Sequence, residues 1–193
     1  MAKTVVLVCV LLVACCAAHA TMIDLSTFFA DDEVEFSPDG TVATFAESEF
    51  HMETFLSDIP GMMSDPGVIF AGPGVWLQFD YVFTEGPVAN SDEFGAWIID
   101  PVSGGSIGAL PGFFRKYSDS GTFSFDLSSL SSTAPWGLQF QLSSLDYDST
   151  PSEADYDSML QISNVQLVPE PITVVALSSL LVGIFTARRL KRD

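Results

Sequence analysis

The sequence predicts a single all-β domain, a jelly-roll-like antiparallel β-sandwich, flanked by a signal peptide and a C-terminal transmembrane helix. Three observations lead to this fold class. Short segments rich in Val, Ile, Phe, Tyr, Trp and Thr alternate with clusters of Gly, Pro, Asp and Ser, which is the pattern of strands and turns. No helical period or internal repeat interrupts them, and an apolar run stands at each end. We therefore expect a leader over residues 1–20, a sandwich over 21–167 and a tail over 168–193.

The N-terminal segment has the features of a secretory signal peptide. A basic start precedes an apolar run over residues 4–16, and Ala18 and Ala20 provide the small residues that signal peptidase requires. The run is too short for a transmembrane helix, so we expect cleavage after Ala20. Leu12-Val13-Ala14-Cys15 also resembles a bacterial lipobox, which would instead leave a lipidated Cys15 at the mature N-terminus. All three cysteines lie in this leader, so we expect a domain without disulfides.

The first predicted strands form a hairpin. Residues 33–36 and 41–45 flank Ser37-Pro38-Asp39-Gly40, which has the composition of a tight turn. The segment 75–84 alternates strictly and is the clearest strand of the chain. One of its faces is apolar and consists of Val75, Leu77, Phe79, Tyr81 and Phe83. Gln78 and Asp80 belong to the opposite face, so we expect one side of this strand to be exposed.

The second half of the domain continues the alternation. Strands are predicted over residues 94–99, 122–127, 137–142 and 159–168. In the last of them, simple alternation places Leu160, Ile162 and Asn164 on one face and Ser163, Val165 and Leu167 on the other. About eight strands in a chain of this length indicate two packed antiparallel sheets.

The C-terminal residues form a tail with three parts. Pro169-Glu170-Pro171 resists both helix and strand and is followed by an uncharged run over residues 172–187. As a helix this run is about 24 Å long, slightly short of a bilayer core. The basic residues after it, which would remain cytoplasmic by the positive-inside rule, are Arg188, Arg189, Lys191 and Arg192.

In this order and at this position, the three parts resemble a PEP-CTERM sorting signal. The resemblance implies that the C-terminal helix first anchors the protein in the inner membrane. It also implies that an exosortase then processes the chain near Pro169–Pro171. The family is associated with bacteria that make exopolysaccharide, so the cell surface or extracellular matrix is the implied destination. An ordinary single-pass anchor is the alternative.

The charge distribution limits the partners of the domain. The formal net charge is −18, and of the seven Lys and Arg residues only Arg115 and Lys116 lie outside the two ends. Such a surface repels phosphate backbones and anionic headgroups, which excludes nucleic acid as a partner. The aromatic content of 12% indicates a folded core, because disordered acidic segments contain few aromatic residues.

Catalytic motifs are absent from the sequence. There is no Gly-x-Ser-x-Gly motif, and His51 is the single histidine after the leader. Acidic residues are abundant, so glycoside hydrolysis is a distant alternative, but no pair of carboxylates stands out. We therefore expect a protein that is not an enzyme.

One acidic segment is a candidate calcium site. It contains Asp146, Asp148, Glu153, Asp155 and Asp157, and carboxylate oxygens are the ligands that calcium prefers. The segment departs from an EF-hand loop, because Thr150 replaces a carboxylate and the required glycine is missing. The alternative is a solubilising loop. Residues 31–33 would add ligands if the first and last strands were neighbours.

Sugar binding is the other candidate activity. Trp76 and Gln78 are out of phase with the apolar face of their strand, so we expect them on an exposed face where an indole can stack on a sugar ring. Trp97 and Trp136 are interpreted as core or loop plugs. The strand segments 77–81, 122–128 and 162–167 are loosely similar to jelly-roll modules of other sorted proteins and of carbohydrate-binding modules. The leading hypothesis is nevertheless a non-catalytic surface or matrix protein, and a carbohydrate-binding module that associates with exopolysaccharide is the alternative.

Overall fold

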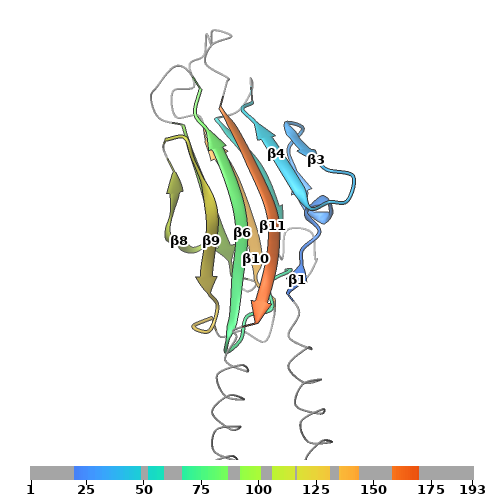
Figure 1. Ribbon diagram of the computed structural model, residues 1–193, viewed down its shortest axis with the longest axis vertical. Coiled ribbons are helices and arrows are strands. Elements are labelled where there is room, and N and C mark those ends of the chain that lie inside the picture. The colour runs from blue at the N-terminus through green and yellow to red at the C-terminus, as the bar shows by residue number, and fades with distance from the viewer. Residues whose placement is uncertain are drawn as a thin grey trace, which may run out of the picture.

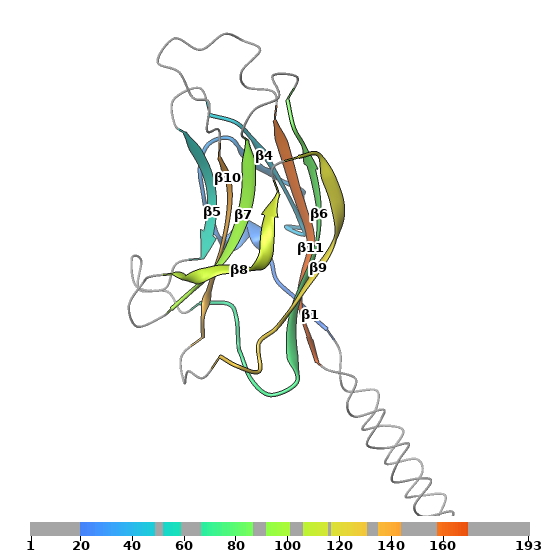
Figure 2. The same cartoon turned by 90° about the vertical axis from the view of Figure 1, so that its left-hand side faces the viewer.

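The protein folds as two antiparallel β-sheets packed face to face (Figure 2). The computed structural model describes residues 20–48, 52–58, 67–86, 92–100, 106–115, 117–130, 135–143 and 158–169. Every pairing between its named strands is antiparallel. The predicted all-β sandwich is confirmed for this part of the chain.

The first sheet, sheet A, has six strands and faces the viewer in Figure 1. Its order across the sheet is β3 (Val34–Phe36), β4 (Val42–Ala46), β11 (Met159–Pro169), β6 (Val75–Thr84) and β9 (Asp119–Asp126). The short strand β1 (Thr21–Met22) pairs with the C-terminal end of β11. The longest strands, β6 and β11, therefore lie side by side near the centre of the sheet.

The second sheet, sheet B, has five strands. Its order is β2 (Phe29–Ala30), β5 (Glu53–Asp58), β10 (Gly137–Ser143), β7 (Glu93–Ile99) and β8 (Ser106–Arg115). A short 3₁₀ helix, η1 (Leu25–Thr27), precedes β2 and is capped by Asp24, which accepts from the backbone N–H of Ser26 at 3.0 Å. Apart from the pairs β3–β4 and β7–β8, consecutive strands belong to different sheets.

The predicted hairpin is confirmed as β3 and β4. Asp39 organises the turn, because its Oδ1 accepts hydrogen bonds from the Ser37 and Thr41 hydroxyls at 2.6 and 2.9 Å. Gly40 has a φ of +67°, a left-handed conformation that favours glycine. These hydrogen bonds lower the pKa of Asp39, that from Ser37 most.

The alternation predicted for the last strand is wrong beyond Ser163. A β-bulge between Ser163 and Gln166 shifts the register of β11 against β6. Within it Asn164 has a φ of +53° and is exposed, whereas Val165 is fully buried. The bulge thus returns the apolar residues of both halves of β11 to the core. These buried residues are Leu160, Ile162, Val165 and Leu167.

The core between the sheets is built from aromatic rings. Phe79 from sheet A is fully buried and contacts Phe113 and Phe140 from sheet B edge-to-face, with ring centroids 4.7 and 5.1 Å apart. Phe113 also contacts Phe94 and Phe123, at 5.0 and 4.4 Å. Edge-to-face rings are a favoured aromatic geometry, so this cluster joins the two sheets.

The observed elements differ from the predicted ones at several boundaries. β8 was not predicted, β9 begins at Asp119 instead of residue 122, and β11 continues through Pro169. Among the residues that the structure describes, no helix has the length and hydropathy to cross a membrane. The predicted transmembrane run over residues 172–187 and the leader up to residue 19 lie outside the described residues, so these predictions remain.

Candidate functional site

Each sheet has an outer face that points away from the core. The part of the outer face of sheet A around Trp76, here called the Trp76 face, consists of Trp76, Gln78, Asp80, Thr122, Ser124, Asp126, Asn164 and Gln166. The part of the outer face of sheet B around Trp97, here called the Trp97 face, consists of Phe29, Phe55, Ser57, Trp97, Phe114, Gln139 and Gln141. Along each strand these outward residues alternate with residues that point into the core, and of the latter Leu77 and Ala96, for example, are fully buried.

The Trp97 face has aromatic residues at both sides and polar residues between them. One row across the strands is Phe29, Ser57, Gln139 and Trp97. The adjacent row is Phe55, Gln141, Gly95 and Phe114. At about 4.8 Å between strands, each row extends about 14 Å across the sheet. The arrangement can therefore contact a ligand several sugar rings long.

Gly95 lets the Trp97 indole lie along the surface of β7. A Cβ atom at Gly95 would stand 2.7 Å from Cη2 of Trp97 and 2.9 Å from Cε1 of Phe114. The Trp97 and Phe114 rings meet edge-to-face with centroids 5.6 Å apart. Phe114 is 41% exposed and Trp97 is half-buried, so the pair forms an accessible aromatic surface at the β7–β8 side.

The polar middle of this face is held by hydrogen bonds between side chains. Gln141 donates from Nε2 to Ser143 Oγ at 2.8 Å, and both residues are buried. Ser57 donates to Gln139 Oε1 at 3.4 Å, and Gln139 is half-buried. Of the two amides, Gln139 is therefore the more accessible to solvent, whereas Gln141 is buried two residues further along β10.

The Trp76 face is more polar. Asp80 accepts from Thr122 Oγ1 at 2.5 Å and from Asn164 Nδ2 at 2.7 Å, and these two bonds, that of Thr122 most, lower its pKa. Gln78 accepts from Gln166 Nε2 at 3.1 Å and donates to Ser124 Oγ at 3.2 Å. The predicted position of Trp76 and Gln78 outside the core is confirmed, because both are half-buried on the outer face. Their role in sugar binding remains a prediction.

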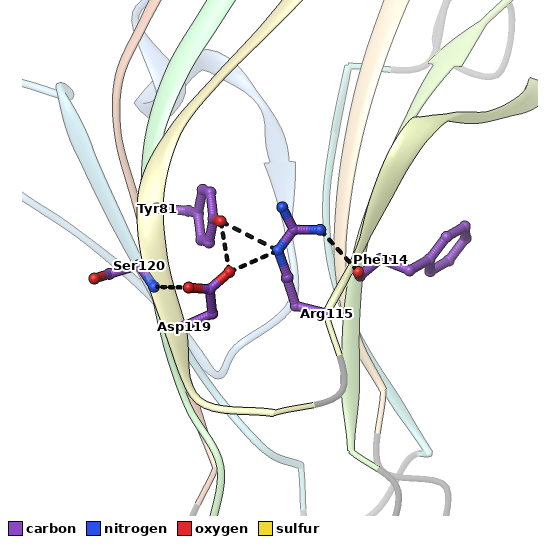
Figure 3. Close-up of polar contacts among 5 residues, drawn as sticks. All are labelled: Tyr81, Phe114, Arg115, Asp119 and Ser120. Carbon is purple, nitrogen blue, oxygen red and sulfur yellow. Dashed lines mark hydrogen bonds and ion pairs between the residues drawn. The ribbon is translucent and has the colours of Figure 1, made fainter.

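A third polar cluster closes the edge between the sheets where the chain passes from β8 to β9 (Figure 3). Arg115 donates from Nε to Asp119 Oδ2 at 2.8 Å and to the Tyr81 hydroxyl at 3.1 Å. The Tyr81 hydroxyl in turn donates to Asp119 Oδ2 at 2.8 Å. Arg115 also donates to the Phe114 carbonyl, at 3.0 Å. We call these residues the Tyr81 cluster.

The Tyr81 cluster shifts the pKa of its members in the directions expected for a tightly bonded group. Burial is the main cause that raises the pKa of Tyr81. The hydrogen bond from Tyr81 is the largest cause that lowers the pKa of Asp119, and the Arg115 charge adds to it. Within the described part of the chain Arg115 is the one basic residue, and its guanidinium is turned toward this edge instead of toward either outer face.

Two buried carboxylates meet at a serine directly before β11. Ser158 donates from Oγ to Asp92 Oδ2 at 2.6 Å and from its backbone N–H to Glu47 Oε2 at 3.0 Å. Glu47 and Asp92 are only 7% and 3% exposed. Within the part of the chain that the structure describes, no group of three or more His, Cys, Asp or Glu is arranged to hold a metal ion.

The calcium prediction concerns other residues. Asp146, Asp148, Glu153, Asp155 and Asp157 lie outside the described residues. Two of the acids at 31–33, the predicted additional ligands, take part in structural hydrogen bonds instead. Asp31 accepts from the Phe55 backbone N–H at 2.7 Å, and Glu33 accepts from Ser48 Oγ at 2.5 Å. Calcium therefore remains a prediction. Other predicted site residues also lie outside the described part. They are the sorting residues Glu170 and Pro171, the basic cluster at residues 188–192, Ala18, Cys15 and His51.

The interpretation of the remaining tryptophans is half correct. Trp136 is 8% exposed and part of the core, as a plug should be. Trp97 is not in the core, because Phe94, Ala96 and Ile98 take the inward positions of β7. Trp97 is out of phase with these apolar residues in the sequence of β7, and this alternation predicts its position on the outer face.

Comparisons with known proteins give weak structural similarity. No protein-family model matches the sequence, and no curated protein matches it. Among solved structures, the tandem CBM22-1–CBM22-2 domain of Paenibacillus barcinonensis Xyn10C is similar with a TM-score of 0.46 and 11% identity over 79% of this chain. This chain spans about half (49%) of that tandem.

Two further structures are similar to a lower degree. A carbohydrate-binding module specific for non-crystalline cellulose, CBM28, has a TM-score of 0.42 and 12% identity, over 73% of this chain and 86% of its own. The K1 cleaved adhesin domain of the Lys-gingipain of Porphyromonas gingivalis has a TM-score of 0.39 and 8% identity, over 78% of this chain and 90% of its own. At TM-scores below 0.5 these similarities carry no argument about the ligand of this chain.

Proposed function

We propose that the domain binds a neutral polysaccharide without cleaving it, and that the Trp97 face is its binding surface. The observation that carries the proposal is the arrangement of this face, in which aromatic rings at both sides flank a polar middle. Sugar rings present apolar faces and a rim of hydroxyls, which match exposed aromatic rings and fixed amides respectively. This proposal selects the carbohydrate-binding alternative over a purely structural role.

The length of the site favours a chain of sugars over a single one. Phe29 is 65% exposed at the far end of the row that ends in Trp97. The two rings are separated by three strand spacings, about 14 Å. A ligand that stacks on both must therefore extend across β5 and β10 and pass over Gln139.

Charge favours a neutral ligand. The chain has a net charge of −18, and Arg115, the one basic residue in the described ranges, is engaged in the Tyr81 cluster. An anionic polysaccharide would be repelled at low ionic strength. A neutral one has no such cost.

The test is affinity electrophoresis or isothermal titration calorimetry of the full chain with neutral oligosaccharides such as cellohexaose, xylohexaose and laminarihexaose. We expect Trp97→Ala to weaken binding at this face by roughly tenfold or more, because loss of the stacked indole removes on the order of 1.4 kcal/mol or more of binding free energy. Gly95→Ala should weaken it as well, since the new Cβ displaces the indole. Tyr117→Ala removes an aromatic ring that is 76% exposed outside both faces and should have no effect. Binding to none of these sugars, or equal binding by all variants, contradicts the proposal.

We also propose, from the sequence alone, that the chain is exported and sorted. Signal peptidase would cleave after Ala20, and an exosortase would process the tail near Pro169–Pro171 and release the domain to the cell surface or matrix. Intact-mass analysis of cell fractions, with and without the exosortase, tests both cleavages. A soluble cytosolic product with both ends intact contradicts this proposal and leaves the binding proposal unaffected.

A further inference from the structure

The Trp76 face is a second polar surface, on the opposite side of the sandwich from the Trp97 face (Figure 2). β6 contributes Trp76, Gln78 and Asp80, which follow one another at every second position. In register beside them are Asp126, Ser124 and Thr122 of β9 on one side and Gln166 of β11 on the other. The face therefore combines one indole with a row of amide, carboxylate and hydroxyl groups.

Hydrogen bonds hold this row in one arrangement. Asp80 is fixed from both sides, by Thr122 at 2.5 Å and by Asn164 at 2.7 Å. Gln78 is fixed from both sides as well, by Ser124 at 3.2 Å and by Gln166 at 3.1 Å. Each carboxylate and amide oxygen has more than one lone pair, so these groups keep acceptor capacity toward solvent. Fixed side chains lose little entropy when a ligand binds, which is the basis of preorganised recognition.

The backbone at the centre of this face is strained. Asn164 is the one residue other than glycine with a positive φ among the described residues, at +53°. It occupies a β-bulge in the middle of β11, beside the long strand β6, where an unbroken ladder is the lower-energy arrangement. A left-handed non-glycine residue costs about 1 kcal/mol or more and persists where it serves a purpose. Here the bulge directs the Asn164 amide at Asp80, and Asn164 remains exposed.

The chemistry of the face selects a neutral ligand rich in hydroxyls. Its ionisable groups are two carboxylates, Asp80 and the exposed Asp126 opposite Trp76, and no basic side chain belongs to it. Anions are therefore disfavoured. Sugar hydroxyls can donate to the fixed oxygens and accept from the amides, while the ring stacks on Trp76 at the end of the row.

We propose that the Trp76 face is a second site for a neutral glycan, so that one domain holds two polysaccharide chains on opposite faces and cross-links them. The inference rests on the proposed function, because it assumes that the Trp97 face binds a glycan of the same class. Because the two faces belong to different sheets, a short oligosaccharide on one does not occupy the other. A long polysaccharide bound at both faces of many copies forms a network.

The first experiment measures stoichiometry. The full chain is titrated with cellohexaose, xylohexaose and laminarihexaose by isothermal titration calorimetry, and we expect about two oligosaccharides per chain for the sugar that binds. Trp97→Ala and Trp76→Ala should each reduce this to about one, and the double variant should not bind. Asn164→Gly keeps the left-handed backbone while removing the amide, so it tests the Trp76 face without disturbing the bulge. We expect Asn164→Gly to weaken the site that remains in Trp97→Ala.

The second experiment measures cross-linking. Wild-type chain should make a solution of the corresponding long polysaccharide turbid at intermediate protein ratios, whereas each single-site variant should bind it without turbidity. If wild type binds one oligosaccharide and Trp97→Ala abolishes binding, the second site does not exist and the proposed function stands. If no sugar binds any variant, the proposed function itself fails. Tyr117→Ala, exposed and outside both faces, should behave as wild type in every measurement.

Discussion

Phe79 offers the sharpest test of how the two sheets are held together. It is fully buried and contacts three other phenylalanines, Phe113, Phe123 and Phe140, with centroids 4.7, 5.4 and 5.1 Å away. Phe79→Ala removes the ring and leaves a cavity between sheets, a change that costs about 3–5 kcal/mol of the free energy of unfolding. A domain of this size has about 5–15 kcal/mol in total. At about 3 °C per kcal/mol, the melting temperature should fall by about 10 °C or more.

The assay is urea denaturation followed by tryptophan fluorescence, with thermal melting as a second measure. Phe29→Ala is the matched control, because it makes the same chemical change at a side chain that is 65% exposed. It should change the free energy of unfolding by less than about 0.5 kcal/mol. Phe79→Leu retains most of the apolar volume and should cost about 1–2 kcal/mol. If Phe79→Ala and Phe29→Ala destabilise equally, the aromatic cluster is not what joins the sheets.

Three further predictions concern polar groups. Tyr81→Phe removes the hydroxyl that bonds Asp119 and Arg115 and should destabilise the domain by about 1–2 kcal/mol in urea denaturation; an unchanged midpoint would mean that the Tyr81 cluster is only a surface contact. Because the pKa of Asp80 is lowered in the folded state, the ionised carboxylate stabilises the fold. This stabilisation is complete above the ordinary aspartate pKa of 3.8 and is lost as the pH falls through the lowered pKa of the folded state. Melting temperature measured from pH 6 downward should therefore drop less steeply in Asp80→Asn, and parallel curves would contradict this. If the acidic segment over residues 146–157 binds calcium, millimolar calcium should raise the melting temperature and a chelator should lower it; no response to either retires the prediction.

The regular parts of the fold could be predicted because their sequence signals are local. β6 was predicted over Val75–Thr84, its observed range, since five apolar residues alternate without interruption. The turn between β3 and β4 was predictable because Asp39 and Gly40 act within the turn itself. For the same reason Trp76 and Gln78 could be assigned to an outer face. In each case the residues that decide the structure are close neighbours in the chain.

The parts that could not be predicted depend on distant pairings. β8 contains Pro111 and two glycines, which interrupt any alternation, and its register against β7 is irregular. The bulge at Asn164 is set by the need to bury Val165 after Ile162, which alternation alone does not reveal. The Trp97 face is assembled from strands far apart in sequence. Its Ser57–Gln139 hydrogen bond, for example, joins residues 82 positions apart. No local pattern indicates that these side chains are adjacent.

The position of β11 has a mechanical consequence. This strand is flanked by β4 and β6 and ends at Pro169, the last residue that the structure describes (Figure 1). Tension applied to that end acts along the strand, so the ladders on both sides are loaded in shear and many hydrogen bonds must break at once. Tension on the other end acts first on β1, whose pairing covers two residues, so far fewer hydrogen bonds resist it. The domain should therefore withstand a far greater pulling force through its C-terminal end than β1 can withstand at the N-terminal end, a difference that single-molecule stretching would measure directly.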